Sequence, residues 1–258
     1  MPPVDSAFVV FDAQGSGCLS YGVEEAGRRW FVKAATTAEG RASLDRACAV
    51  HAAVRHPTIV RPTWTIRGAA GPTLVYPWYD GSVLNHATVH GADRSALARF
   101  QHLPVPQVEA ALDAILDAHL AVSAAGLVAV DLYDGCFLYD FDASRMRLID
   151  LDEYRPGPFV LAADRLPGSR RYMAPEEFAR GAVIDDRTTV HALGRALHHL
   201  LDSPANGRGA HGNRRNSPRR WRGSSDQRRV VERATRQAPA ARYPDVPTLV
   251  RAWRLATP

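Results

Sequence analysis

The sequence predicts an α+β fold made of a small β-rich N-terminal lobe, residues 1–80, and a larger, mostly helical C-terminal lobe, residues 81–258. Two observations support this division. Up to residue 80, short runs of β-branched and aromatic residues alternate with glycine-containing turns, which is typical of strands. After Gly81, apolar residues recur at three- and four-residue spacing over long segments, which is typical of amphipathic helices. We therefore expect one domain, over residues 1–258, with two unlike halves.

The N-terminal lobe is predicted to be a small sheet with one helix. The β-rich runs predict strands over residues 7–12, 19–23, 30–34, 59–66 and 73–78. Turns separate the first three strands, and residues 68–72 form a hairpin loop between the last two. A helix is expected over residues 44–54, because apolar residues follow helical spacing there and the pattern stops before Pro57.

The C-terminal lobe contains the longest amphipathic pattern. Residues 106–124 place Val108, Leu112 and Ile115 on one face of a helix. Further helices are expected over residues 188–201, 228–235 and 246–255, and short strands over residues 137–139 and 146–149. Residues 203–225 are rich in Gly, Asn, Ser and Arg and have no periodicity, so they predict a loop or a disordered segment.

Composition limits the class of protein. The chain has 258 residues, 46% of them hydrophobic, which is enough for a sizeable core. It has no apolar run of about 18 residues, so no membrane span is expected. The N-terminus lacks the pattern of a secretory signal, and the three cysteines are widely spaced, so a cytoplasmic protein is expected. The net charge of +5 is local, because residues 202–229 carry eight arginines against two aspartates, and this disfavours a nucleic-acid partner.

Candidate functional residues follow one another in a defined order. A glycine turn, Gly15-Ser16-Gly17, joins the first two predicted strands, and Lys33 lies on the third. Lys33 is the one lysine among 32 lysines and arginines, so its compact ammonium is a candidate for a task that a guanidinium cannot perform. Asp131 follows the long helix and Asp150 ends a strand. A last motif reads Arg171-Tyr172-Met173-Ala174-Pro175-Glu176.

These motifs, in this order, resemble the eukaryotic-type serine/threonine protein kinases, including the bacterial ones, over nearly the whole chain. Trp30-Phe31-Val32-Lys33 looks like the strand that carries the kinase lysine, and His56-Pro57-Thr58-Ile59-Val60 like the segment after the next helix. Asp131-Leu132 and Asp150-Leu151-Asp152 stand in the places of the His-Arg-Asp-Leu and Asp-Phe-Gly motifs. The stretch that ends in Ala174-Pro175-Glu176 is the most specific match.

The resemblance implies a binding site for ATP and Mg²⁺. Lys33 and Asp131 would be the catalytic residues, Lys33 pairing with phosphates and Asp131 accepting the substrate hydroxyl proton. Asp150 and Asp152 would bind Mg²⁺. ATP would contact Gly15, Ser16, Gly17, Val23, Lys33, Pro77, Tyr79 and Leu138. Glu176 and Arg242 would form a buried ion pair in the larger lobe.

Several positions depart from the kinase pattern. The helix glutamate that should pair with the lysine is Ala47, and the catalytic-loop asparagine is Cys136, a poor Mg²⁺ ligand. Phe31 stands where a small residue covers adenine, and Thr189 where an aspartate braces the catalytic loop. Residues 151–168 contain no Ser or Thr, and Val130 replaces the phosphate-binding arginine, so the activation segment is expected to be ordered without phosphorylation.

The sequence is compatible with three functions. The leading hypothesis is an ATP-dependent protein kinase that phosphorylates Ser or Thr of an unidentified protein substrate. A pseudokinase, which would bind nucleotide or a docking partner without catalysis, is the second, because of the degenerate positions. A small-molecule kinase is the third, because an Asp-x-Asp like Asp150-Leu151-Asp152 also occurs in aminoglycoside- and choline-type kinases.

Overall fold

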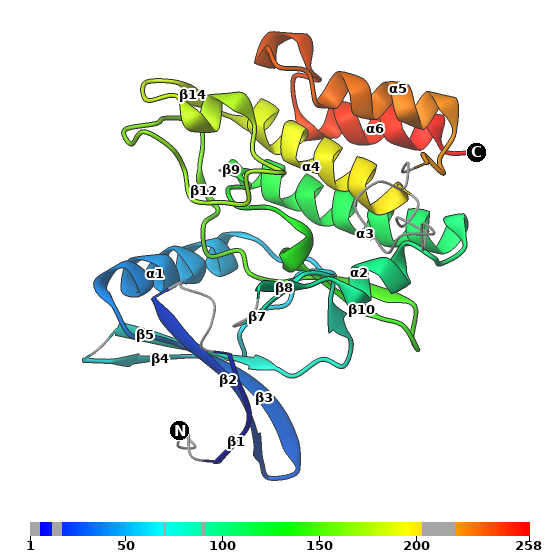
Figure 1. Ribbon diagram of the computed structural model, residues 1–258. Coiled ribbons are helices and arrows are strands. Elements are labelled where there is room, and N and C mark those ends of the chain that lie inside the picture. The colour runs from blue at the N-terminus through cyan, green and yellow to red at the C-terminus, as the bar shows by residue number, and fades with distance from the viewer. Residues whose placement is uncertain (1–5, 12–16, 70, 89–90, 203–219) are drawn as a thin grey trace.

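The fold is known from a computed structural model, which describes residues 6–11, 17–69, 71–88, 91–202 and 220–258. An antiparallel sheet with one helix forms the N-terminal part, and a group of helices forms the C-terminal part (Figure 1). The predicted α+β class is confirmed. The arrangement is compatible with a two-lobed layout.

Five strands form the N-terminal sheet in the order β1-β2-β3-β5-β4, each antiparallel to its neighbours. Their bounds are Ala7–Phe11, Cys18–Glu25, Arg28–Ala35, Trp64–Gly68 and Gly71–Pro77 for β1 to β5. The strand predicted over residues 59–66 is wrong in its first half, because Ile59 forms only an isolated bridge, with Leu148. Pro57 and Pro62 flank this half and lack the N–H group that a strand ladder needs.

The register of β2 on β3 assigns side chains to the two faces of the sheet. Ser20 lies opposite Lys33, whereas Val23 lies opposite Trp30. Because successive side chains of a strand point to opposite faces, Val23 faces away from Lys33. It is buried there in a cluster with Tyr21, Trp30, Val32 and Val75. The prediction that Val23 contacts the nucleotide is therefore wrong, and Gly22 occupies that strand position on the face of Lys33.

Helix α1 (Ala38–Ala53) packs on the face of the sheet that carries Lys33 (Figure 1). Its first turn is capped by Thr37, whose hydroxyl accepts a hydrogen bond from the N–H of Gly40 at 3.1 Å. Leu44 and Ala47 are buried against β5. The helix begins earlier than the sequence predicts because this cap precedes the first apolar residue of the periodic pattern.

The helices of the C-terminal part pack around α3, which contacts both α4 and α6. The helices predicted over residues 106–124, 188–201, 228–235 and 246–255 are confirmed, with ends within three residues of the prediction, whereas α2 was not predicted. The bounds are α2 Ser95–Phe100, α3 Val105–Ala124, α4 Asp186–Leu201, α5 Ser225–Ala234 and α6 Val246–Ala256. Within the described ranges, no helix has the length and apolar character that crossing a bilayer requires.

Short strands and turns hold the loops between these helices. The pairs are β10 (Phe137–Asp140) with β11 (Arg145–Leu148) and β6 (Ser82–Val83), β9 (Leu127–Val128) with β12 (Arg155–Pro156), β13 (Phe159–Val160) with β14 (Val183–Ile184), and β7 (His86–Thr88) with β8 (Gly91–Asp93). Turns of 3₁₀ helix span Asp134–Cys136, Pro175–Phe178 and Pro239–Ala241. As a result, Asp131 follows β9 closely and Asp150 follows β11.

The arginine-rich segment predicted as a loop lies mostly outside the described residues, which resume at Arg220. At its C-terminal end, residues 220–224 form a loop, as predicted, and this loop is packed against the rest of the fold. Trp221 forms an isolated bridge with Asp202, and Arg222 donates hydrogen bonds to the carbonyl groups of Gln101 and Leu103. These contacts fix the chain before α5 begins, so residues 220–225 belong to the packed fold.

Candidate active site

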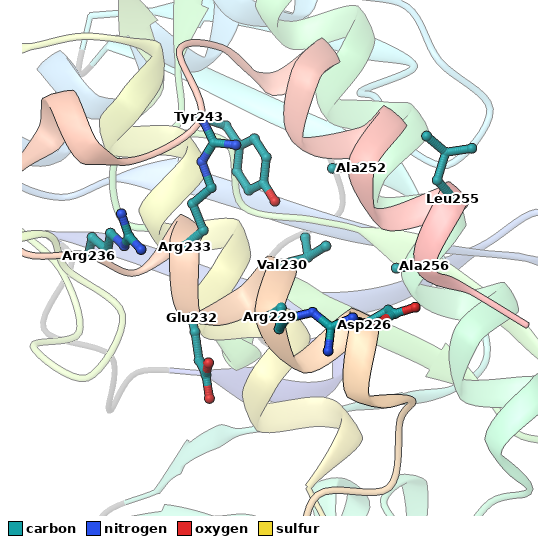
Figure 2. Close-up of a pocket in the computed structure, with 10 residues that line it drawn as sticks. All are labelled: Asp226, Arg229, Val230, Glu232, Arg233, Arg236, Tyr243, Ala252, Leu255 and Ala256. Carbon is teal, nitrogen blue, oxygen red and sulfur yellow. Dashed lines mark hydrogen bonds and ion pairs between the residues drawn. The ribbon is translucent and has the colours of Figure 1, made fainter.

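A hollow of about 520 Å³ lies on the C-terminal part, between α5, α6 and Tyr243 (Figure 2). The Arg233 guanidinium lies 4.3 Å from the centroid of the Tyr243 ring, and Arg229 pairs with Asp226. None of the residues predicted for catalysis or binding lines this hollow. Those residues lie instead where the sheet, α1 and the loops of the C-terminal part meet.

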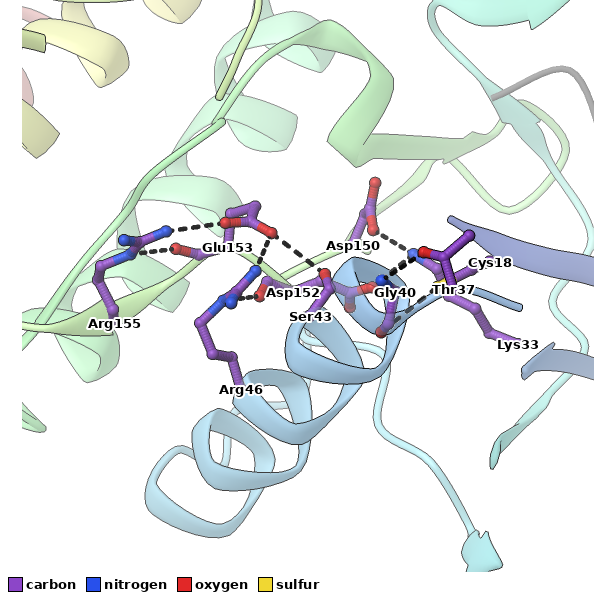
Figure 3. Close-up of polar contacts among 10 residues, drawn as sticks. All are labelled: Cys18, Lys33, Thr37, Gly40, Ser43, Arg46, Asp150, Asp152, Glu153 and Arg155. Carbon is purple, nitrogen blue, oxygen red and sulfur yellow. Dashed lines mark hydrogen bonds and ion pairs between the residues drawn. The ribbon is translucent and has the colours of Figure 1, made fainter. Parts of the chain in front are cut away.

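Lys33 is at the centre of the predicted site and forms two ion pairs (Figure 3). Its Nζ lies 2.8 Å from Oδ1 of Asp150 and 2.5 Å from Oδ2 of Asp152. The Lys33 side chain is 9% exposed, whereas Asp150 is 39% and Asp152 is 7% exposed. Burial by itself would lower the pKa of the Lys33 ammonium, but the two carboxylates outweigh it and hold that pKa well above its usual value.

The residue after Asp152 connects helix α1 to the same segment. Glu153 accepts hydrogen bonds from Arg46 and from the Ser43 hydroxyl, the latter at 3.1 Å, and both donors belong to α1 (Figure 3). Arg155 donates to the other oxygen of Glu153 at 2.8 Å. Sequence reasoning missed this link. Its only sequence signal is a third acid directly after Asp152, together with an arginine on α1.

Asp131 and Asp150 both have left-handed backbones, with φ of 58° and 61°. Non-glycine residues adopt this conformation rarely, and such strained positions concentrate at functional sites. Asp131 Oδ1 accepts a hydrogen bond from the N–H of Ser169 at 3.3 Å. Burial, with a further contribution from the charge of Asp150, raises the pKa of Asp131 to about 7.

Two of the departures from the kinase pattern have structural roles in the loop of Asp131. The Thr189 hydroxyl accepts a hydrogen bond from the N–H of Ala129 at 3.0 Å, so threonine braces the loop from α4. The Cys136 thiol is fully buried, and its Sγ donates to the carbonyl of Asp131 at 3.3 Å. Burial raises the pKa of this thiol well above its usual value, so it stays protonated at neutral pH. Cys136 therefore fills a buried position in this loop.

Of the predicted glycine turn, Gly15 and Ser16 lie outside the described residues. Gly17 has a φ of 67°, and its carbonyl accepts hydrogen bonds from Thr36 and Thr37, at 2.9 and 3.2 Å. A Cβ at this position would lie 2.3 Å from the Thr37 hydroxyl. Glycine is therefore required here by the close approach of the turn to the start of α1.

Aromatic side chains gather on the sheet face that carries Lys33. The ring centroids of Phe11 and Phe31 are 5.9 Å apart, and those of Phe31 and Tyr76 are 6.1 Å apart. His86 lies edge-on to Phe11, at 5.4 Å. These rings present flat apolar surface where the resemblance places the adenine base, and aromatic faces of this kind stack with other rings.

The other predicted nucleotide contacts lie near the connection between the two parts of the chain. Pro77 is the last residue of β5 and lies opposite Trp30. Tyr79 lies two residues further along the chain, and the Arg147 guanidinium is 3.7 Å from its ring centroid. Leu138 lies in β10, opposite Arg147, and is half-buried between the core residues Phe137 and Tyr139. By alternation, Leu138 points away from that core.

The 150–176 segment is held by polar contacts to its surroundings. Arg171 donates to the buried Asp134 at 2.7 Å, which ties the end of the segment to the loop after Asp131. The Tyr154 hydroxyl lies 2.9 Å from Nε2 of His119 in α3. Strand β12 pairs with β9. These contacts support the prediction of an ordered segment without phosphorylation.

The predicted ion pair of Glu176 and Arg242 is confirmed. Arg242 donates from Nη1 and Nη2 to the two carboxylate oxygens, at 2.6 and 2.8 Å. The Thr188 hydroxyl donates to Glu176 Oε1 at 2.9 Å. The Arg242 side chain is fully buried. This bidentate pair anchors the end of the segment to the helical part.

Glu177 is a buried acid that sequence reasoning did not identify. Its Oε2 accepts a hydrogen bond from the N–H of Ala174 at 2.5 Å, and only 3% of the residue is exposed. Burial raises the pKa of Glu177 to about 8. The side chain is therefore protonated at neutral pH in the folded protein, although it would be ionised in the unfolded chain.

This protonation gives a stability prediction. Glu177 has a raised folded-state pKa, so its contribution to the free energy of unfolding falls as pH rises from about 4.5 to about 8. Replacing Glu177 with glutamine removes the titration and keeps an oxygen for the Ala174 N–H. Between pH 5 and pH 8, the variant should lose less stability than the wild type, by on the order of a few kcal/mol. Urea denaturation at both pH values measures this difference, and equal losses in the two proteins would contradict the assignment.

The residues assembled here could hold a magnesium nucleotide. Within the described ranges, no group of three or more His, Cys, Asp or Glu side chains forms a preformed metal site. Mg²⁺, however, is commonly bound by one or two carboxylates together with substrate phosphates. Asp150 is the accessible carboxylate. Ser20 lies opposite Lys33 in the strand register, and its buried hydroxyl has no hydrogen-bond partner among the described residues.

Lys33, Asp131 and Asp150 thus come from separate parts of the chain and meet at one site, which combines a cation, a partly exposed carboxylate and a carboxyl group whose pKa is raised to about 7. No protein-family model matches this chain, and no match was found among curated proteins. The chemistry that this set of groups favours is the binding of a polyphosphate and the removal of a proton from an acceptor.

Proposed function

We propose that the chain is an ATP-dependent phosphotransferase of the protein-kinase type, which transfers the γ-phosphoryl group of ATP to a Ser or Thr hydroxyl of a protein. The observation that carries the proposal is the Lys33–Asp150 ion pair of 2.8 Å, which joins residues 117 positions apart and is near enough for its charges to affect the pKa of Asp131. Phosphoryl transfer depends mainly on positioning and charge stabilisation, and these three groups supply both.

Each group would have one role. Lys33 would bind phosphate oxygens, and Asp150 would bind Mg²⁺ because its carboxylate is the more exposed of the two beside Lys33. The aromatic face around Phe31 would stack against the base. When bound, Mg²⁺ would neutralise the charge of the phosphates.

Asp131 would act as the general base for the acceptor hydroxyl. A base is most effective when its pKa lies near the working pH, and the pKa of Asp131 is raised to about 7. Ser169 holds the carboxyl through its backbone N–H. The 150–176 segment approaches Asp131 at Ser169 without a phosphate group, so activity would be constitutive or controlled by a partner.

A pseudokinase is the second candidate, and it is favoured by a specific observation. Phe11, Phe31 and Tyr76 crowd the face where the base would lie, and Cys136 offers a buried, protonated thiol in place of an oxygen ligand. A protein with these features could bind a partner through this face without catalysing transfer.

A transfer assay separates the two functions. The purified protein is incubated with Mg²⁺, γ-labelled ATP and dephosphorylated casein, and the labelled residues are identified by phosphoamino-acid analysis. We expect label on serine or threonine, its loss in Asp150→Asn, and its retention in Asp142→Asn, which changes an exposed turn residue. ATP binding with no label on any protein or small hydroxyl compound would contradict the proposed transfer and favour the pseudokinase.

A further inference from the structure

Helix α1 provides no acidic partner for Lys33. The acids of α1 are Glu39 and Asp45, both exposed, and Asp45 pairs with Arg67 on the surface. The inner side of the helix is apolar, with Leu44, Ala47 and Val50 buried. If a metal ion binds Asp150, the Lys33 ammonium needs a second carboxylate to keep its position. That carboxylate must come from a part of the chain other than α1.

We propose that Asp152 is the positioning residue for Lys33: its carboxylate, 2.5 Å from the ammonium, holds Lys33 in place so that Asp150 is free to bind metal. This role rests on the proposed function. It differs from the sequence prediction that Asp152 binds Mg²⁺, because the Asp152 side chain is 7% exposed and faces the ammonium, whereas Asp150 is 39% exposed.

The backbone around Asp152 is anchored independently of any ligand. Arg46 donates from Nε to the carbonyl of Asp152 at 3.2 Å, and it also pairs with Glu153 (Figure 3). Glu153 in turn binds Arg155 next to β9 and β12. The direction of the Asp152 side chain is therefore fixed by α1 on one side and by the C-terminal part on the other. Through these contacts, Asp152 and Glu153 connect Lys33 and helix α1 to strand β12.

The single lysine of the chain makes this inference directly testable. Reaction of Lys33 with an amine-acylating reagent, mapped by mass spectrometry, reports how firmly its ammonium is held. The variants are Asp152→Asn, Asp152→Glu, which keeps a carboxylate, and Asp45→Asn as an exposed control on α1. The Mg·ATP-dependent rise in melting temperature is measured in parallel for each protein.

In Asp152→Asn, we expect Lys33 to be acylated severalfold faster, because its ammonium loses one of the two carboxylates that hold it in place, and a less firmly held amine is reached more readily by the reagent. We also expect a smaller Mg·ATP-dependent rise in melting temperature in this variant. Asp152→Glu should restore both the slow acylation and the rise in melting temperature, and Asp45→Asn should behave like the wild type. Acylation and a Mg·ATP response in Asp152→Asn that both equal the wild type would overturn the inference. Absence of a Mg·ATP response in the wild type would instead overturn the proposed function, and the acylation rates would still decide whether Asp152 holds Lys33.

Discussion

Replacing Arg242 with alanine is expected to lower the free energy of unfolding by about 3–5 kcal/mol, since it leaves the Glu176 carboxylate buried without its cation. The guanidinium also donates to the carbonyl groups of Arg236, Arg187 and Gln237, at 2.7, 3.0 and 2.9 Å. The variant therefore loses hydrogen bonds to the main chain as well as the ion pair. Urea denaturation at neutral pH measures the change.

Arg254 offers a matched control for this measurement. It also pairs with two carboxylates, Asp113 and Asp117, but its side chain is 43% exposed. Surface pairs of this kind contribute about 0–1 kcal/mol, so Arg254→Ala should change stability little. The account of the buried pair is wrong if Arg242→Ala and Arg254→Ala destabilise the protein equally.

Replacing Asp131 with asparagine is expected to reduce kcat by about 10²–10⁴-fold, the usual contribution of a general base. The amide oxygen can still accept the hydrogen bond from Ser169, so the loop should keep its conformation. The thermal unfolding of the variant, measured alongside, should remain close to that of the wild type. A variant with wild-type kcat would remove Asp131 from the reaction.

The pH dependence of the same reaction gives a second test of Asp131. The base must be ionised to accept a proton, and burial raises its pKa to about 7. The rate of the wild-type protein is therefore expected to increase through pH 7 and then level off. A rate that is already constant from pH 5 upward would show that the carboxyl titrates at its ordinary value.

Local patterns were sufficient to predict the long helices of the C-terminal part, but they missed the short helix α2 and the first turns of α1. Helix α3 combines twenty residues with a continuous apolar face, and helices of this length form wherever that face can be buried. The Glu176–Arg242 pair was also predicted, but from the resemblance to kinases and not from spacing, because its members lie 66 positions apart.

The sequence predictions were wrong or incomplete at positions whose contacts depend on tertiary packing. Assigning Val23 to the nucleotide failed because a shift of one residue along β2 moves a side chain to the other face of the sheet. The partner of Asp152 could not be predicted, because Lys33 belongs to β3 and the pair forms only when the sheet packs on the C-terminal loops. The hydrogen bond from Ala129 to Thr189 was missed for the same reason. Thr189 belongs to α4, and its hydroxyl reaches the N–H of Ala129 only when α4 packs against the loop.

The central claim is that Lys33 belongs to a site for Mg·ATP, and a thermal-shift measurement with Lys33→Met tests it most directly. At about 100 times the Kd, ligand binding adds about 2.7 kcal/mol of stability. For a chain of this size, that corresponds to a rise of roughly 5–10 °C in Tm. We expect this rise for the wild type and none for a folded Lys33→Met variant. A rise of equal size in both proteins, or none in the wild type, would contradict it.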